Sequence, residues 1–150
     1  MKKLMFAILL FVATLSCASA QNIPSYSANG VAISVRNTGN NLISELFKED
    51  SIFNFNIAVA SFGPGKRLDW HSHPGCQILI ITEGIGYYQE RGKARQIVNK
   101  GEIIKCLPGV EHWHGASSES MVTYMATYST LKGTTKWLEK VSDDQFNGKN

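Results

Sequence analysis

The sequence predicts an all-β fold, a sandwich or barrel followed by a short helix near the C-terminus. From Asn54 onward, runs rich in β-branched and aromatic residues recur about every 8–12 residues, and glycine-containing turns separate them. One stretch alone, close to the end of the chain, has helical periodicity. The 150 residues, 43% of them hydrophobic and 18% charged, fit one globular domain.

Residues 1–20 are predicted to form a secretory signal peptide. Met1-Lys2-Lys3 is a positive start, residues 4–15 are apolar apart from Thr14, and Ala18-Ser19-Ala20 supplies small residues before a cut ahead of Gln21. The apolar run is too short to cross about 30 Å of hydrocarbon. We therefore expect an exported protein, periplasmic or secreted, with no transmembrane segment in the mature chain.

Charge and cysteine content narrow the class of protein further. Removing the leader lowers the formal net charge from +3 to about +1, and no run of lysine and arginine exceeds two residues, so we expect no nucleic-acid partner. Cys17 makes a lipoprotein the minor alternative to simple cleavage. Cys76 and Cys106 are too few for a disulfide scaffold and are interpreted as small core residues; whether they pair is left open.

Residues 21–53 are predicted to be an N-terminal arm. The stretch up to Asn41 is polar and rich in Asn, Ser and Gly, with one strand expected at Val31–Val35. Leu42–Phe47 fits either a helical turn or a strand.

Residues 54–130 are predicted to be the barrel core. Turn residues such as Gly63-Pro64-Gly65 and Pro108-Gly109 bound its strands, and Arg91-Gly92-Lys93 marks a hairpin. The expected strands are Asn54–Phe62, Gln77–Thr82, Gly86–Glu90, Ala94–Val98, Ile103–Leu107 and Met121–Ser129.

Residues 131–150 are predicted to be a helical tail. Within Thr134–Phe146, the apolar residues Trp137, Leu138 and Val141 mark one helical face, and Thr134 is the expected cap. We expect this helix to pack on the outside of the barrel or against a partner subunit.

All four histidines occur in two His-x-His pairs, His71-Ser72-His73 and His112-Trp113-His114. Alternate residues of a strand point to the same face, so each pair presents two imidazoles to one space, and Gln77 shares the parity of the first pair. The pattern predicts a metal site with His71, His73 and His112 as nitrogen ligands and Gln77 as an oxygen ligand. Surface or hydrogen-bonded histidines are the alternative.

Two segments resemble the two motifs of the cupin family. The first contains Gly65, His71-x-His73, Gln77 and Gly84, and the second runs from Gly101 to Pro108-Gly109-Val110-Glu111-His112. The chain departs from the family pattern by having Gln77 where Glu is usual, a one-residue longer spacing before Pro108, and no Asn four residues after His112.

A narrower resemblance is to small bacterial single-domain cupins, named for association with carboxymuconolactone decarboxylases, which include manganese-dependent hydroxynitrile lyases. It rests on Trp70-His71-Ser72-His73-Pro74-Gly75-Cys76-Gln77 and on Pro108-Gly109-Val110-Glu111-His112-Trp113-His114-Gly115. The resemblance implies a double-stranded β-helix (jelly-roll barrel), a homodimer, and a divalent metal, manganese first, with iron, nickel or zinc also compatible. It also implies that His114 lines the pocket without binding the metal, and that Tyr124 stands where the lyases commonly have another His.

The site's chemistry follows from its neutral ligands. Without a carboxylate, a divalent ion keeps its full charge and is the stronger Lewis acid. His114 is the candidate general acid/base, because an ordinary imidazole pKa near 6.5 suits proton transfer at neutral pH; a supporting or surface His is the alternative. Tyr124 is the candidate donor to a metal-bound oxygen, or else an ordinary strand aromatic. Asp69 is a candidate orienter of His71.

The predicted function is that of a metal-dependent, lyase-like enzyme acting on a small hydroxylated or carbonyl compound. A cupin dioxygenase and a non-catalytic periplasmic small-molecule-binding protein are the alternatives. Core and pocket wall are expected from apolar residues near the motifs, namely Phe62, Trp70, Leu79, Ile81, Leu107, Trp113 and Met125.

Overall fold

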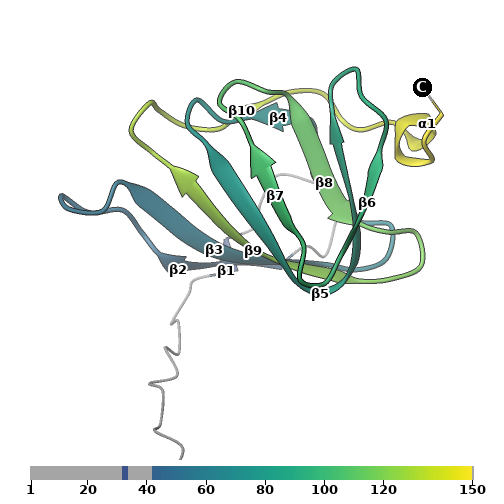
Figure 1. The fold of residues 1–150 in the computed structure, drawn as a ribbon, viewed down its shortest axis with the longest axis horizontal. Coiled ribbons are helices and arrows are strands. Elements are labelled where there is room, and N and C mark those ends of the chain that lie inside the picture. The colour runs from purple at the N-terminus through teal and green to yellow at the C-terminus, as the bar shows by residue number, and fades with distance from the viewer. Residues whose placement is uncertain (1–31, 34–41, 150) are drawn as a thin grey trace, which may run out of the picture.

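The computed structural model describes residues 32–33 and 42–149. The predicted signal peptide and most of the predicted N-terminal arm lie outside these ranges. The elements, drawn in Figure 1, are β1 (Ala32–Ile33), β2 (Leu42–Phe47), β3 (Phe55–Phe62), β4 (His71–Ser72), β5 (Gln77–Glu90), β6 (Gln96–Asn99), β7 (Ile103–Cys106), β8 (His112–Ala116), β9 (Val122–Ser129), β10 (Lys136–Trp137) and α1 (Asp143–Phe146).

Two antiparallel sheets curl against each other to make the predicted jelly-roll half-barrel (Figure 1). The first sheet contains β1, β2, β3, β9, the first half of β5, and β7. The second contains the remainder of β5 with β6, β8, β4 and β10. The predicted all-β class with a short C-terminal helix is confirmed, and Leu42–Phe47 is a strand.

Strand β5 joins the two sheets, where the sequence suggested two separate strands. Its register against β9 shifts between Ile81 and Glu83, a bulge of the kind that bends a strand. The bend needs glycine. Gly84 has φ of 75° and a Cβ there would lie 1.9 Å from the Met121 carbonyl oxygen, while a Cβ on Gly86 would lie 2.2 Å from the Tyr124 hydroxyl.

The apolar residues form two clusters. The main core fills the space between the sheets and contains Phe62, Leu79 and Ile81 as predicted. The second cluster contains Trp70, Trp113, Tyr87, Val141 and Phe146.

Several predicted core or pocket residues lie elsewhere. Trp70 and Trp113 are buried core residues as predicted, but they belong to the second cluster, because each neighbours an inward-facing histidine and strand alternation turns it outward. Leu107 is 62% exposed. Met125 is Cα partner of Val59 on the outer face of the first sheet. Cys76 is exposed while Cys106 is buried, and both are free thiols.

The predicted helix over Thr134–Phe146 is wrong in its extent, because only Asp143–Phe146 is helical. Trp137 packs against the main core and Leu138 against the second cluster, so these neighbours point to opposite sides as in a strand. Pairing of β10 with β4 stabilises the extended form. Ser142, not Thr134, caps the helix, in a capping box with Gln145.

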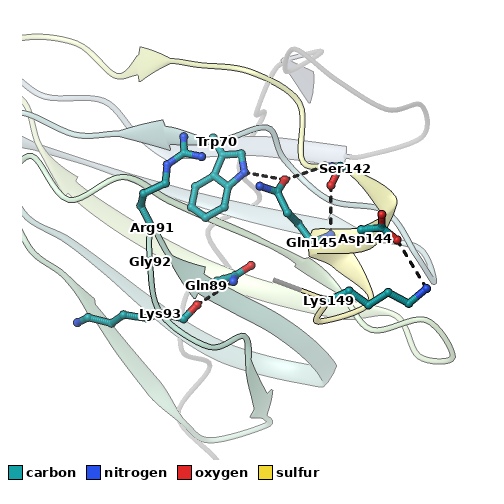
Figure 2. Close-up of a pocket in the computed structure, with 9 residues that line it drawn as sticks. All are labelled: Trp70, Gln89, Arg91, Gly92, Lys93, Ser142, Asp144, Gln145 and Lys149. Atoms are coloured by element: carbon teal, nitrogen blue, oxygen red, sulfur yellow. Dashed lines mark hydrogen bonds and ion pairs between the residues drawn. The ribbon is translucent and has the colours of Figure 1, made fainter.

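Helix α1 is held against the barrel through Trp70 (Figure 2). The indole Nε1 of Trp70 donates to Gln145 Oε1 over 3.2 Å, and the Arg91 guanidinium lies 4.0 Å from the centroid of the Trp70 ring. Arg91 is itself neutralised by Glu111 and Glu139, at 2.9 and 2.7 Å. Trp70, Arg91 and Gln145 are among the residues that line a cavity of about 550 Å³. Among the described residues, no helix has the length and apolar character needed to cross a membrane.

Candidate metal centre

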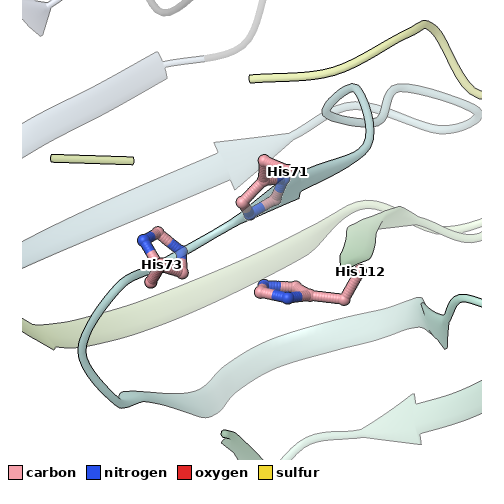
Figure 3. Close-up of side chains that lie close together, drawn as sticks. All are labelled: His71, His73 and His112. Carbon is pink, nitrogen blue, oxygen red and sulfur yellow. The ribbon is translucent and has the colours of Figure 1, made fainter. Parts of the chain in front are cut away.

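The structure brings together three of the predicted ligands, His71, His73 and His112. His71 begins β4 and is the Cα partner of His112 at the start of β8, while His73 follows β4 directly. All three side chains are buried, and one ligand atom from each lies within 4.8 Å of the others (Figure 3). The i, i+2 parity argument therefore placed the imidazoles correctly.

Backbone carbonyls fix the tautomer of two of these histidines. The Nδ1 atom of His71 lies 2.8 Å from the carbonyl oxygen of Asp69, and Nδ1 of His112 lies 2.9 Å from that of Val110. A carbonyl oxygen only accepts hydrogen bonds, so each Nδ1 carries the proton and each Nε2 has a free lone pair. Asp69 thus orients His71 through its main chain, as carbonyl acceptors of metal-bound histidines commonly do.

Two further features of the cluster are consistent with a bound cation. His73 Nε2 is buried without a hydrogen-bond partner among the described residues. The amide oxygen of Gln77 lies 3.3 Å from the unprotonated Nε2 of His112. The lone pair of His112 Nε2 faces the oxygen of Gln77, and the buried Nε2 of His73 makes no hydrogen bond with a described residue. Both arrangements cost free energy unless a cation lies between these atoms. Three imidazole nitrogens and one amide oxygen suit divalent transition metals.

Burial keeps the imidazoles in the neutral state that binds metals. Desolvation, with repulsion from His112 and His114, holds the pKa of His71 well below its usual value. Desolvation lowers the pKa of His73 to about 4 and also lowers that of His112. Because a protonated imidazole has no lone pair for a metal, these lowered pKa values keep the cluster ready to bind at neutral pH.

His114 lies beside the cluster but outside it. Its ring centroid is 5.4 Å from that of His71 and 6.2 Å from that of His112. Both of its ring nitrogens are buried without a partner among the described residues, and burial lowers its pKa well below the usual value. This is the placement expected for a pocket histidine that does not bind the metal, and its acid/base role stays a prediction.

Tyr124 was predicted to donate a hydrogen bond to a metal-bound oxygen, but its hydroxyl is already used elsewhere. Its hydroxyl donates to the carbonyl oxygen of Gly115 over 2.7 Å, and the side chain is fully buried. The ring packs edge-on against His114, with centroids 5.1 Å apart. The placement favours the structural alternative, in which Tyr124 satisfies a buried carbonyl and supports His114.

A small cavity lies against the imidazoles and opens through a wider mouth. The inner cavity, of about 120 Å³, has His71, His73, Gln77 and His114 as its polar wall and Ile43, Ala58, Ala60, Leu68 and Ala126 as its apolar wall. The mouth, of about 370 Å³, includes Glu49 and Asn56. Three residues line both spaces and were not predicted from the sequence, namely Tyr128, Thr135 and Trp137.

Different signals bear on these three residues. Tyr128 shares strand parity with Ala126, so the two-residue period of β9 was sufficient to find it. Thr135 and Trp137 were missed because the segment that carries them was interpreted as helix.

Comparison with known proteins places this arrangement among related barrels. A family model described as "Cupin domain" matches residues 58–128. A protein named (R)-mandelonitrile lyase, from Granulicella tundricola, is 39% identical over 90 residues, which cover 59% of this chain and 69% of that protein. A solved cupin-like protein from Thermotoga maritima is 39% identical and superposes with a TM-score of 0.71 over 73% of this chain and 84% of that one.

More distant structures share the fold alone. A DMSP lyase from Ruegeria pomeroyi is 14% identical and has a TM-score of 0.60 over 75% of this chain and 61% of that one.

Proposed function

This chain belongs to the cupin family, and on that premise we propose that it is a metal-dependent lyase that cleaves a small cyanohydrin-type compound. The observation that carries the proposal is the buried cluster of three neutral imidazoles, His71, His73 and His112, next to His114, whose ring nitrogens make no hydrogen bond with any described residue. The 39% identical relative named (R)-mandelonitrile lyase supplies the reaction class.

His71, His73 and His112 hold the metal through Nε2, and Gln77 offers its amide oxygen. The ion supplies Lewis-acid polarisation of a substrate oxygen. We propose manganese as the physiological ion, while iron, nickel and zinc suit the same donors. Elemental analysis of protein isolated from its own compartment distinguishes them, and protein that contains only zinc or copper would contradict manganese.

The chain's own residues move one proton and seat the substrate. An imidazole nitrogen of His114 takes the hydroxyl proton of the cyanohydrin, and the electron pair of that O–H bond becomes the second carbon–oxygen bond. The carbon–carbon bond to the nitrile breaks, and the departing cyanide takes its proton from His114. The apolar wall of Ala58, Ala60 and Ala126 receives the hydrocarbon part of the substrate and keeps water out.

The test is cyanide release from mandelonitrile by the manganese-loaded protein. We expect benzaldehyde and cyanide in equal amounts, and His114→Ala to lower kcat about 10²–10⁴-fold, the usual contribution of general acid–base catalysis. Glu83→Ala, at an exposed position, is the matched control and keeps full activity. Oxygen uptake with a flavonol or diketone in place of cyanide release would identify a dioxygenase. Stabilisation by small acids that persists after chelation would identify a binding protein.

We also propose that the protein is exported and that cleavage precedes Gln21, on the strength of the leader pattern alone. Mass spectrometry of the protein from the periplasm or medium is expected to show Gln21 as the first residue. A lipid on Cys17 would replace this proposal with a lipoprotein.

We propose that the outer face of the first sheet is the interface of a homodimer. The strand segments Phe55–Phe62, Val122–Ser129 and Gln77–Thr82 carry no charged residue. At one edge of the face, Phe47, Phe53 and Phe55 form an aromatic cluster with ring centroids 5.6–5.9 Å apart. Lys105 of β7 lies at the border of this otherwise apolar face, and the apolar part can pack against the same part of a second copy, as a two-fold interface requires.

The area of this face is sufficient for a second copy. Five strands spaced about 4.8 Å apart and on average about six residues long give about 500 Å² per copy, or about 1,000 Å² in total, the size that a specific interface should at least reach.

Light scattering tests the dimer. We expect twice the chain mass for the wild type and the monomer mass for Met125→Lys, which places a charge in the middle of the face. Ile97→Lys, 59% exposed on β6 of the other sheet, leaves the dimer intact. A monomeric wild type would overturn the interface, and dye binding to this face that appears only after deletion of residues 21–41 would assign the face to that segment instead.

A further inference from the structure

The cluster's three histidines are oriented in two different ways. His71 and His112 each contact the main-chain carbonyl of the residue two positions earlier. His73 instead contacts a side chain that is 62 positions away in the sequence, because its Nδ1 lies 3.0 Å from the hydroxyl oxygen of Thr135. Thr135 precedes β10 and lies outside residues 58–128, the part matched by the family model.

We propose that Thr135 is a positioning residue for His73, and this inference rests on the metal site proposed above. The Thr135 hydroxyl oxygen accepts the Nδ1 proton of His73, so that Nε2 keeps its lone pair and faces the cluster. An isolated neutral imidazole exchanges its proton between the two nitrogens, and the hydrogen bond at one nitrogen selects the tautomer that leaves the other free for a metal.

The opposite arrangement, in which Thr135 donates to Nδ1, is disfavoured by the surroundings of His73. That arrangement puts the ring proton on Nε2, which is buried and makes no hydrogen bond of normal geometry with the residues that the structure describes. Orphaned buried N–H donors are rare because their desolvation is not repaid. A lone pair on the same atom can instead serve as the ligand atom that His73 contributes beside those of His71 and His112, where a cation satisfies it.

The segment that carries Thr135 also determines where both histidines of the first pair lie. Trp137 is the Cα partner of His71, and the two rings lie 4.9 Å apart. The ring of His73 stacks on Tyr128 with centroids 5.9 Å apart, which sets the plane of the imidazole but not its tautomer. The hydroxyl of Thr135 therefore selects the tautomer of His73, which ring packing alone does not do.

The test compares Thr135→Val, which keeps the shape and removes the hydroxyl, with Thr135→Ser, which restores a hydroxyl. Thr134→Val, at the exposed neighbouring position, is the matched control. We expect Co²⁺ affinity, measured by chelator competition, to fall about 10- to 100-fold in Thr135→Val, the usual cost of losing such a partner. Thr135→Ser and Thr134→Val should stay within about threefold of the wild type.

A second measurement needs no metal. In ¹⁵N NMR of the metal-free protein at neutral pH, we expect His73 to be protonated at Nδ1 in the wild type and to lose that preference in Thr135→Val. Unchanged Co²⁺ affinity in Thr135→Val, or a wild-type His73 protonated at Nε2, overturns this inference. A wild type that binds no Co²⁺ while its His73 is protonated at Nδ1 overturns the metal site and leaves the orienting role of Thr135 supported.

Discussion

We expect that replacing His112 with alanine abolishes metal binding, whereas replacing His114 with alanine leaves the metal content of the protein unchanged. The two histidines sit two residues apart on β8 and therefore share a strand face, yet only His112 has a ligand atom within 4.8 Å of those of His71 and His73. Loss of one of three imidazoles removes a full coordinate bond, and we expect the metal-to-protein ratio after dialysis to fall from about one to near zero.

This comparison separates metal binding from proton transfer. His114→Ala retains the ion but loses cyanide release, so the two variants fail for different reasons in the same assay. Elemental analysis and the thermal shift on adding Mn²⁺ give independent readings of the bound ion. Equal loss of metal from both variants would refute the division of roles and would make His114 a fourth imidazole ligand.

We expect the metal-free protein to lose stability steeply as the pH falls from about 7 toward 4. The folded-state pKa values of His71, His73, His112 and His114 are all lowered by burial, to about 4 for His73. Between these pKa values and the ordinary value near 6.5, the unfolded chain binds more protons than the folded one. The free energy of unfolding therefore rises with pH across this window and falls as the solution becomes acidic, by on the order of 1 kcal/mol per pH unit for each such histidine.

Urea unfolding of the metal-free protein at a series of pH values measures this slope. Bound Mn²⁺ competes with protons for the same nitrogens, so saturation with the ion should shift the loss of stability to lower pH. His73→Phe removes one of the titrating groups and should make the slope shallower. A free energy of unfolding that stays flat from pH 7 to pH 5 would show that the imidazoles are accessible to water and have the same pKa values in the folded and the unfolded chain.

Most residues of the candidate site could be predicted from the sequence, because strand alternation depends only on positions close together in the chain. In a strand, residues two apart share a face, and this rule alone placed His71 with His73 and His112 with His114. Turn residues marked most of the strand ends, although β5 was predicted as two strands because Gly84 resembled a break. Its role as a bend depends on the close approach of Met121 from β9, which is a tertiary contact.

The rest of the site depends on pairing between distant segments. The apolar residues Trp137 and Leu138 fit a helical face, but pairing of β10 with β4 gave them an extended backbone, and Thr135 came to lie over His73. The hydroxyl of Tyr124 was expected in the pocket because the family resemblance places Tyr124 where the lyases commonly have another His. That resemblance does not reveal that the carbonyl oxygen of Gly115 lies 2.7 Å away and accepts the hydrogen bond of the hydroxyl.

The two metal-facing strands have a second, outward side that the tail of the chain covers. Trp70 precedes His71 and Trp113 follows His112. Both indole rings pack in the second cluster, to which α1 contributes Phe146. Deleting the chain from Val141 onward is expected to expose both indoles. It should also destabilise the strands that carry His71 and His112. We therefore expect the metal affinity of the three histidines to depend on the packing of α1. Purification tags are better fused upstream of the barrel than after Asn147.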